Sequence, residues 1–566
     1  MEYSGAAILM ECLKTEDVEV IFGYPGGSII ELFDEMSRHG DVLKPFLVRH
    51  EQGAVHAADG YARASGKPGV CIFTSGPGAT NAVTGIATAH SDSIPLVVIT
   101  GQVPTPLIGN DAFQEVDIVG ITRPCTKHNY LVKDVKNLAG IVRQAFHLAQ
   151  SGRPGPVLID LPKDIILGKT EFVRPGEVRM RSYNPNYKPN LVQLRRAAEL
   201  LLRAERPLFL IGGGVIGSDA SSVVTDIALR LDIPVVSTLM GLGGFPGTHR
   251  LWCGMLGMHG VYTANRAVTE ADVLLAVGTR FADRITGKLS AFAKQARIVH
   301  IDIDPTSIRK NVNVDVPVVA DCRESVLGLS ELLPAGPTDE NLLKARAEWL
   351  KRLDRYKAEH PLGYAQNGEI KPQRVIELLD RLTRGKDKVI VTTDVGQHQM
   401  WTAQFFKFTR PRTFLSSGGL GTMGFGLPAA MGAQIARPDD LVICIAGDGS
   451  IQMNIQELAS VVAAGLPVKV IILNNRFLGM VRQWQELFMK RNYVCTDLEG
   501  CEPDFVKLAE AYGATGLLVE DDAGLEEALQ KVLDTPGPVV ADVRVRREEN
   551  VYPMVPAGKS LAEMII

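Results

Sequence analysis

The sequence predicts an α/β protein made of three doubly wound domains, each a parallel sheet covered by helices on both faces. Three observations favour this class. Short apolar runs of strand length alternate with stretches of helix length along most of the chain. Two irregular segments that contain proline, residues 169–190 and 335–370, divide this alternation into three sets. At 566 residues, the chain is also too long for a single hydrophobic core.

The first predicted domain spans residues 1–168. Its apolar runs predict strands at residues 19–22, 45–48, 69–74, 95–100 and 156–160. Helix-length segments separate these runs, so consecutive strands are expected to be parallel. The following linker, 169–190, is rich in Arg, Pro, Asn and Tyr and has no sustained period, as expected for a segment that crosses a surface between domains.

The second and third sets define a central domain at 191–334 and a third domain at 371–546. The predicted strands are 207–211, 233–237, 273–277 and 297–302 in the central domain, and 388–392, 441–446, 468–473 and 538–543 in the third. Within the connector 335–370, one charged helix is expected around Leu343 to Lys357. Residues 547–566 are expected to form a C-terminal tail.

Composition and charge exclude several classes of function. The chain has 60 basic and 64 acidic residues without long blocks of one sign, so no nucleic-acid partner is expected. None of its 8 cysteines forms a CxxC pair, and the first residues lack the basic flank and cleavage site of a signal peptide. No apolar run approaches the ~18 residues of a membrane span. A cytoplasmic protein that acts on small molecules, with no membrane partner, is therefore expected.

The most specific chemical signal stands at the ends of two predicted strands of the third domain. Gly447-Asp448-Gly449-Ser450 follows one strand, and Asn474-Asn475 closes the next. Carboxylate and amide oxygens at this edge of a parallel sheet, with phosphate oxygens, suit a hard cation such as Mg²⁺, so Asp448 and Asn475 are the predicted metal ligands. A glycine-rich turn without a ligand is the alternative. The spacing resembles the diphosphate-anchoring motif of thiamine-diphosphate enzymes, whose cofactor supports carbanion chemistry on 2-oxo acids.

Glu51 stands directly after the predicted strand 45–48 and opens a helix of small residues. A carboxylate at a helix N-terminus can be partly desolvated and still electrostatically supported, which suits acid/base chemistry. Taken alone, a role as a helix cap or salt-bridge partner is the favoured interpretation. Beside the Asp448 motif, Glu51 resembles the glutamate with which thiamine enzymes protonate the pyrimidine ring of their cofactor so that the ylid can form.

Several further stretches make the resemblance specific. They are Phe22-Gly-Tyr-Pro-Gly-Gly27, Arg49-His-Glu-Gln-Gly-Ala54, Ser75-Gly-Pro-Gly-Ala-Thr-Asn81, Asp111-Ala-Phe-Gln-Glu115, Asp160-Leu-Pro-Lys-Asp164, Gly421-Thr-Met-Gly424 and Gly479-Met-Val-Arg-Gln-Trp484. Over essentially its whole length, the chain resembles the catalytic large subunits of the acetohydroxyacid synthase (acetolactate synthase) family. In that family the first domain binds the pyrimidine and the third binds the diphosphate, and the cofactor lies between domains of different chains. The resemblance therefore implies a homodimer or homotetramer.

The resemblance also implies a reaction and the residues that carry it. The enzyme, a transferase, would decarboxylate pyruvate on thiamine diphosphate and condense the hydroxyethyl carbanion with pyruvate or 2-oxobutanoate. The products would be 2-acetolactate or 2-aceto-2-hydroxybutanoate, the first common step of valine, leucine and isoleucine biosynthesis. Glu51 would be the catalytic residue. The implied thiamine-diphosphate contacts are Tyr24, Pro25, Glu51, Gly396, Gln397, His398, Gly421, Met423, Asp448, Gly449, Ser450, Asn475, Gly479 and Met480.

The central domain carries a glycine-rich stretch, 212–217, after a predicted strand. A nicotinamide site also needs an acidic residue at the end of the next strand, and Asp232 precedes that strand, so no such site is expected. The resemblance implies FAD without net redox work; an empty domain descended from a nucleotide binder is the alternative. Ala282 replaces an acidic residue common in the FAD-containing branch. The implied FAD contacts are Arg153, Gly212, Gly213, Gly214, Thr238, Leu239, Leu256, Gly257, Met258, His259, Gly278, Thr279, Arg280, Asp283, Arg284, Asp302, Ile303 and Asp321.

Met480 and Trp484 stand four positions apart on a predicted helix beyond the metal-binding turn, so they share one face. Such a pair usually packs in a core. After this motif, it resembles the family's selectivity wall, which favours 2-oxobutanoate as acceptor. One methylene in an apolar pocket is worth about 1 to 3 kcal/mol, so the wall would bias the choice without excluding pyruvate. The implied substrate residues are Gly27, Phe113, Gln114, Lys163, Met258, Arg284, Met480 and Trp484.

Two alternatives to this function remain open. One is another thiamine enzyme, such as the FAD-containing pyruvate oxidase, against which Trp484 argues, or glyoxylate carboligase, which lacks the glutamate found here as Glu51. The other is a non-catalytic flavoprotein, disfavoured by the joint presence of Glu51, Asp448 and Asn475. No segment resembles a regulatory ligand-binding module, so feedback control would require a separate small regulatory subunit.

Overall fold

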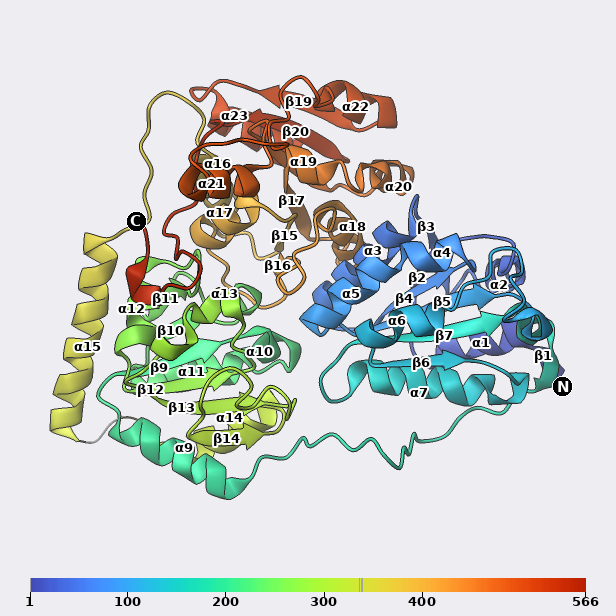
Figure 1. The fold of residues 1–566 in the computed structure, drawn as a ribbon, viewed down its shortest axis with the longest axis horizontal. Coiled ribbons are helices and arrows are strands. Elements are labelled where there is room, and N and C mark those ends of the chain that lie inside the picture. Colours follow the sequence, from blue (N-terminus) through green and yellow to red (C-terminus); the bar gives the residue numbers. More distant parts are fainter. Residues whose placement is uncertain (1, 335, 337–338) are drawn as a thin grey trace.

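The computed structural model describes residues 2–334, 336 and 339–566. Within these residues, three six-stranded parallel sheets form, and helices cover their faces (Figure 1). The predicted α/β class with three doubly wound domains is confirmed. In Figure 1 the first domain is blue to cyan, the central domain green and the third orange to red. Residue 1, where the first domain was expected to begin, and residue 335, the predicted start of the second connector, lie outside the described residues.

The sheet of the first domain has the strand order β3-β2-β4-β5-β7-β6. Its strands are β2 (Val20–Tyr24), β3 (Lys44–Leu47), β4 (Gly69–Phe73), β5 (Leu96–Gln102), β6 (His128–Leu131) and β7 (Pro156–Pro162). Its helices are α1 (Gly5–Thr15), α2 (Ile30–Ser37), α3 (Glu51–Ser65), α4 (Pro77–Asn81), α5 (Val83–Asp92), α6 (Ile118–Thr122), α7 (Leu138–Gln150) and α8 (Lys163–Leu167). Strands β4, β5 and β7 are buried along their whole length, which explains their continuous apolar sequences.

The central sheet has the order β11-β10-β9-β12-β13-β14. Its strands are β9 (Pro207–Ile211), β10 (Val235–Ser237), β11 (Trp252–Met255), β12 (Val273–Val277), β13 (Arg297–Asp302) and β14 (Val316–Val319). Its helices are α9 (Leu191–Arg203), α10 (Gly213–Gly217), α11 (Ser221–Leu231), α12 (Tyr262–Glu270), α13 (Asp283–Thr286) and α14 (Cys322–Leu332). Strands β10 and β11 are added on one side of β9, and β12 then pairs with the other side of β9. A crevice at the carboxyl ends of these two strands is therefore expected.

The sheet of the third domain has the order β16-β15-β17-β18-β20-β19, which repeats the connectivity of the first sheet. Its strands are β15 (Val389–Thr393), β16 (Phe414–Leu415), β17 (Leu441–Gly447), β18 (Lys469–Asn474), β19 (Thr515–Val519) and β20 (Val539–Arg544). Its helices are α16 (Pro372–Thr383), α17 (Gln397–Phe405), α18 (Gly426–Ala436), α19 (Asp448–Ile451), α20 (Leu458–Ala463), α21 (Gly479–Phe488), α22 (Phe505–Tyr512) and α23 (Leu525–Asp534). In this sheet the order in which strands are added changes direction between β15 and β17.

The connectors are anchored to the domains that they join. The first begins with a short strand, β8 (Lys169–Glu171), paired antiparallel with β1 (Glu2–Ser4), and then runs outside the domains to α9 (Figure 1). The second contains α15 (Glu340–Glu359), which packs on the central domain. Its buried Arg346 donates to the carbonyl oxygens of Leu201 and Ala204. The C-terminal tail also reaches the central domain, because the backbone N–H of Val555 donates to the carbonyl oxygen of Met258.

The first and third domains of one chain pack closely through α3 and α18. Small residues make this contact possible: a Cβ on Gly60 would lie 2.2 Å from the carbonyl oxygen of Ala429. A buried ion network extends the contact, since the Arg63 guanidinium donates to Asp59 and Asp92 and to the carbonyl oxygen of Ser416. The two domains therefore form one packed unit.

In the part of the chain that the structure describes, no helix is both long enough and apolar enough to cross a membrane.

Candidate active site

The carboxyl edge of the third sheet brings together predicted residues from three strands. Gln397 and His398 open α17 just after β15, Asp448 opens α19 after β17, and Asn475 follows β18. The Asn475 side-chain amide donates to Gln397 Oε1 at 3.3 Å. A Cβ on Gly479 would lie 2.2 Å from the same Gln397 oxygen, so α21 begins close against this cluster.

The charged and polar groups of this cluster are deeply desolvated. Asp448 is 1% exposed, and its Oδ2 has no hydrogen-bond partner among the described residues. Burial raises the pKa of the Asp448 carboxyl to about 7, against the opposing hydrogen bond from the Asn475 backbone N–H. His398 Nε2 is also buried without a partner, and burial lowers the pKa of this imidazole to about 3, so it is neutral. A carboxylate oxygen and a ring nitrogen are thus available to a ligand.

Asp394 belongs to the same edge, although the sequence did not single it out. It follows β15, and its Oδ1 accepts from the backbone N–H of Gly424 at 2.7 Å. Its Oδ2 is buried and has no partner in the described part of the chain, and burial raises the pKa of this carboxyl to about 6. Asp394 holds the loop that contains the predicted residues Gly421 and Met423. Its place directly after a buried strand was the signal that could have identified it.

Helix α21 presents Met480 and Trp484 in an unusual setting. The positions that α21 buries are polar: Arg482 donates to the carbonyl oxygen of Glu549, and Gln483 exchanges hydrogen bonds with the backbone of Val551. Met480 and Trp484 are only partly buried. Because the C-terminal tail occupies the polar face, Trp484 does not serve as the core anchor of this helix.

Glu51 is the first residue of α3 and is 8% exposed. Its Oε2 accepts from the Asn81 side-chain amide at 2.9 Å. A Cβ on Gly78 would lie 3.1 Å from Glu51 Oε1, so the glycine leaves room for the carboxylate. Asn81 was not among the predicted site residues, although it ends the matching stretch Ser75 to Asn81. Its amide orients the Glu51 carboxylate from one side.

The predicted substrate residues of the first domain lie at its surface. The Lys163 ammonium donates to the carbonyl oxygen of Gly27 at 2.8 Å and pairs with Glu31 at 3.2 Å. Phe113 is 88% exposed. Gln114 adopts a positive φ of 58°, and its carbonyl oxygen would be 2.7 Å from a Cβ on Gly76. Gly27 and Lys163 are therefore in contact, whereas Phe113 projects outward.

The remaining two predicted substrate residues contact each other on the central domain. The Arg284 guanidinium lies 3.4 Å from Met258 Sδ, and the Met258 backbone N–H donates to the Arg284 carbonyl oxygen. The predicted substrate residues thus form three groups, one on each domain.

The central domain shows a close approach of two glycine loops at the ends of β9 and β12. The Gly214 N–H donates to the Gly278 carbonyl oxygen at 3.1 Å. A Cβ on Gly212 would lie 2.1 Å from that oxygen, and one on Gly214 would lie 2.6 Å from Gly278 Cα. Only glycine fits these two positions, because the loops leave no space for a side chain. The predicted FAD residues 212–214 and 278–280 therefore meet at the switch point of this sheet.

Several buried polar groups near the carboxyl ends of the central strands have no partner among the described residues. They are Ser237 Oγ, His259 Nδ1 and Thr279 Oγ1. Burial also raises the pKa of the Asp302 carboxyl, at the end of β13, to about 6. Buried polar groups are normally satisfied, so these three unpartnered groups at the ends of neighbouring strands suit a polar ligand.

The other predicted FAD residues have identifiable places. Arg153 donates to Ser93 Oγ within the first domain and to Asp304 of the central domain. Asp321 caps α14 by accepting from the Glu324 N–H. Asp304 was not among the residues predicted from the sequence. The rest follow strand ends or open α13: Thr238, Leu239, Leu256, Gly257, Ile303 and Asp283.

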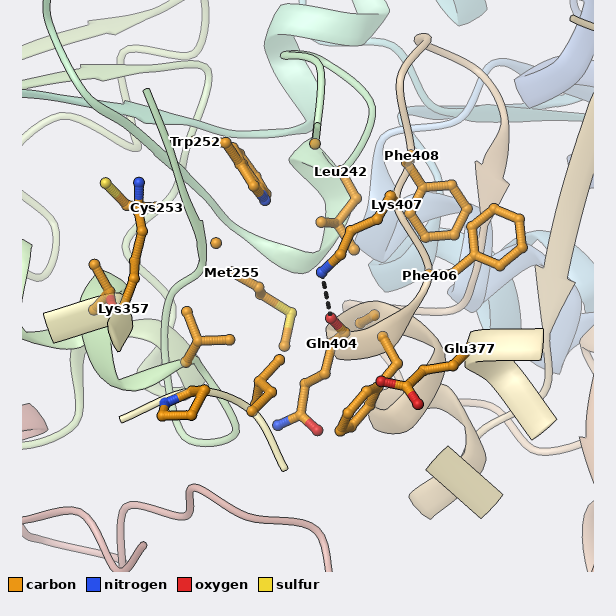
Figure 2. A pocket seen from close by; sticks show the side chains of 18 of the residues that line it. Leu242, Trp252, Cys253, Met255, Lys357, Glu377, Gln404, Phe406, Lys407 and Phe408 are labelled. Carbon is orange, nitrogen blue, oxygen red and sulfur yellow. Dashed lines mark hydrogen bonds between the residues drawn. The ribbon is translucent and has the colours of Figure 1, made fainter. Parts of the chain in front are cut away.

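A cavity of about 340 Å³ lies between the central and third domains, beside α15. Figure 2 shows its lining, with Trp252, Met255 and Phe408 among the apolar side chains and Lys407 turned toward the carbonyl oxygen of Gln404. Its lining residues are not among the predicted site residues. The cavity nevertheless adjoins a predicted cofactor residue, because the side-chain amide of Gln404 in its lining donates to the carbonyl oxygen of His259 at 2.9 Å.

Three models of thiamine pyrophosphate enzymes match the chain in order. The N-terminal TPP binding domain matches residues 3–121, the central domain matches 194–329, and the C-terminal TPP binding domain matches 394–543. The matched segments contain Glu51, the glycine loops of the central domain, and both Asp448 and Asn475.

Curated relatives match the chain over nearly its whole length. The acetolactate synthase large subunit of Parasynechococcus marenigrum is 51% identical, over 99% of this chain and 91% of that protein. The acetolactate synthase isozyme 3 large subunit of Escherichia coli is 49% identical over 99% of this chain and 98% of its own length. The acetolactate synthase large subunit of Haemophilus influenzae is 45% identical over 100% and 98%. With this identity and coverage, the chain belongs to the acetolactate synthase large-subunit family of thiamine pyrophosphate enzymes.

Proposed function

We propose that this chain is the catalytic subunit of an acetolactate synthase. It decarboxylates pyruvate on thiamine diphosphate and transfers the remaining two-carbon unit to pyruvate or 2-oxobutanoate, giving 2-acetolactate or 2-aceto-2-hydroxybutanoate. The observation that carries this proposal is the edge of the third sheet, where Asp448, Asn475 and His398 come together with unpartnered polar atoms. The whole-length likeness to acetolactate synthase large subunits supports the reaction.

Thiamine diphosphate supplies a nucleophilic carbon and an electron sink when it is bound. The residues of the third domain fit its diphosphate and a Mg²⁺ ion. Asp448 Oδ2 is buried and unpartnered, and Asn475 at the end of the neighbouring strand would add an amide oxygen. In the described residues, no group of three or more His, Cys, Asp or Glu side chains could hold a metal. Asp448 and Asn475 would supply part of the coordination shell of Mg²⁺, which commonly binds one or two protein groups with phosphates and water.

Glu51 holds and moves a proton at its carboxyl oxygens. Its burial and the hydrogen bond from Asn81 fix the carboxylate in one orientation, so a pyrimidine nitrogen could share a proton with it. Met480 and Trp484 form the apolar wall against which the acceptor lies. Lys163 and Arg284 supply positive charge for the carboxylate of a 2-oxo acid.

The proposed active site joins two chains. Glu51 and the substrate residues near Gly27 belong to the first domain, and the metal ligands belong to the third. Phe113 is exposed together with Leu107 of the same loop, which suits a surface that a second chain covers. The site is therefore incomplete in a monomer, and a homodimer or a tetramer of such dimers is the functional unit.

Co-expression of two inactive chains tests this assembly. One chain carries Glu51→Gln and the other Asp448→Asn. If the site joins two chains, half of the randomly formed dimers have one site with both native residues, and about a quarter of the wild-type activity returns. If each site uses a single chain, every site carries a substitution. Activity that stays at the level of the separately expressed variants would contradict the shared site.

Replacement of Trp484 by Leu is expected to change the choice of acceptor. The smaller side chain withdraws apolar contact from the extra methylene of 2-oxobutanoate, so the preference for it over pyruvate should fall by about 5- to 100-fold. A competition assay with both acceptors, in which the two products are measured separately, checks this. Val481→Ala on the exposed face of α21 is the matched control and should leave the ratio unchanged. An unchanged ratio in Trp484→Leu would remove this residue from the acceptor site.

FAD is the proposed ligand of the central domain. The unpartnered Ser237, His259 and Thr279 groups and the glycine loops between β9 and β12 suit a bound dinucleotide. The overall reaction is redox neutral, so the flavin has no net electron transfer to perform. The purified protein should show the flavin absorption bands after gel filtration. Protein that carries no flavin, and that takes up none when it is mixed with an equimolar amount of FAD, would contradict this assignment.

A small regulatory subunit is the proposed protein partner, since the relatives are named as large subunits. The proposed location is the cytoplasm, where pyruvate is available and the eight free cysteines would stay reduced.

A further inference from the structure

Glu457 is a buried carboxylate that the reaction described above does not use. It ends the 3-10 turn Ile455–Glu457 in the third domain, nine residues after Asp448, and is 0% exposed. Its side chain nevertheless contacts the first domain. Glu457 Oε1 accepts from the backbone N–H groups of Arg49 and His50, both at 3.0 Å, while Oε2 accepts from Ser460 Oγ at 3.0 Å.

These two backbone groups stand directly before Glu51. His50 is the N-cap of α3, and Glu51 is its first helical residue. In a capping box, the third helical residue is a Glu or Gln whose side chain accepts from the N-cap N–H. The third residue of α3 is Gly53, which has no side chain to do this. Glu457 takes over that function from another domain.

Gly53 also leaves the space that Glu457 needs. A Cβ on Gly53 would lie 2.5 Å from Glu457 Oε1 and 2.9 Å from its Cδ. The carboxylate is thus fitted between the N-cap backbone and a position that must be glycine. Burial raises the pKa of this carboxyl to about 6, partly offset by the hydrogen bonds from Arg49, Ser460 and His50. Burial of an acid is unfavourable unless it is hydrogen-bonded. The buried Glu457 carboxyl therefore holds the backbone at the start of α3 more firmly than a solvent-exposed cap would.

We propose that Glu457 is a positioning residue for Glu51. It clamps the Arg49-His50 backbone and so sets the place of the Glu51 carboxylate relative to the third domain of the same chain. This inference rests on the proposed role of Glu51. The stretch from 448 to 457 begins with a proposed metal ligand and ends with the clamp, so a shift of this stretch moves the start of α3 as well.

The test removes the clamp from either side. Glu457→Ala deletes the acceptor, and Gly53→Ala displaces the carboxylate while adding a residue that favours helix. Both variants should lower kcat by about 10- to 100-fold with little change in KM for pyruvate, because small displacements of a catalytic group are costly. Glu457→Gln keeps an oxygen for the two N–H groups and should restore most of kcat. Ser460→Ala removes only the hydrogen bond from Ser460 and leaves the contacts with the Arg49 and His50 N–H groups, so it is the matched control.

A second measurement does not depend on turnover. Amide hydrogen exchange in the peptide that contains Arg49 and His50, measured without cofactor, should be at least about 10-fold faster in Glu457→Ala and Gly53→Ala than in wild type and Ser460→Ala. Unchanged exchange in both variants would overturn the clamp. If Glu457→Ala fails to fold, Gly53→Ala decides alone.

Combination with Glu51→Gln separates this inference from the role of Glu51 itself. If Glu457 acts through Glu51, Glu457→Ala combined with Glu51→Gln should be no slower than Glu51→Gln alone. Multiplied losses would overturn the inference. Full activity of Glu51→Gln would instead overturn the proposed role of Glu51. If Glu51→Gln is impaired while Glu457→Ala and Gly53→Ala are folded and fully active, only the positioning role is overturned.

Discussion

Replacement of Glu51 by Gln is expected to lower acetolactate formation by about 10²- to 10⁴-fold, the usual contribution of a positioned acid or base. Gln has nearly the same size, and its amide oxygen can still accept the hydrogen bond from Asn81. The variant therefore loses the ability to exchange a proton while the packing of α3 is preserved. Initial rates at saturating pyruvate, thiamine diphosphate and Mg²⁺ give the size of the effect.

The matched control for this variant is Glu19→Gln. Glu19 lies in the same domain and pairs with Lys67 at the surface, where an ion pair contributes little. Its kcat should equal that of the wild type. If Glu51→Gln kept its folded state and retained wild-type kcat, Glu51 would be a structural cap, which is the interpretation favoured by its position at a helix N-terminus alone.

Asp448→Asn is expected to raise the Mg²⁺ concentration needed for half-maximal activity by about 10- to 100-fold or more. Loss of a group that only hydrogen-bonds to a metal ligand already has an effect of that size. Asn keeps the volume of the side chain but removes the negative charge that a hard cation needs. Titration of cofactor-free protein with Mg²⁺ and thiamine diphosphate, followed calorimetrically, separates this loss from an effect on turnover.

A surface aspartate provides the control for the charge change. Asp439 is exposed and pairs with Lys388, so Asp439→Asn alters the net charge equally without entering the cluster. Its Mg²⁺ dependence should match the wild type. The same Mg²⁺ dependence in Asp448→Asn would show that Asp448 is not a metal ligand.

The central strands of each sheet could be predicted because both of their faces are buried. Strands such as β5 and β17 therefore read as continuous apolar runs. Of the edge strands, only β3 was predicted, at residues 45–48, whereas strands such as β6 and β16 were missed. β6 is polar and only partly buried, and β16 has just two residues, so neither carries a periodic signal of its own. These strands form because a neighbouring strand is already in place, which local sequence does not record.

The same distinction applies to the candidate site. Asp448 and Asn475 could be predicted as neighbours because the carboxyl ends of parallel strands meet at one edge. Asn81 and Glu457 could not. Glu457 lies 408 positions from Arg49, and their contact depends on how the first and third domains pack. Only Gly53, a glycine at the third position of a helix, hinted that the usual capping side chain had to come from elsewhere.

The most direct test of the account is the identity of the product. The purified protein is incubated with thiamine diphosphate, Mg²⁺, FAD, pyruvate and 2-oxobutanoate, and the carbon products and released CO₂ are quantified. The proposed function predicts 2-acetolactate and 2-aceto-2-hydroxybutanoate, with one CO₂ released for each molecule formed. Consumption of pyruvate with release of CO₂ but without either product, for instance as acetate with uptake of oxygen, would contradict it.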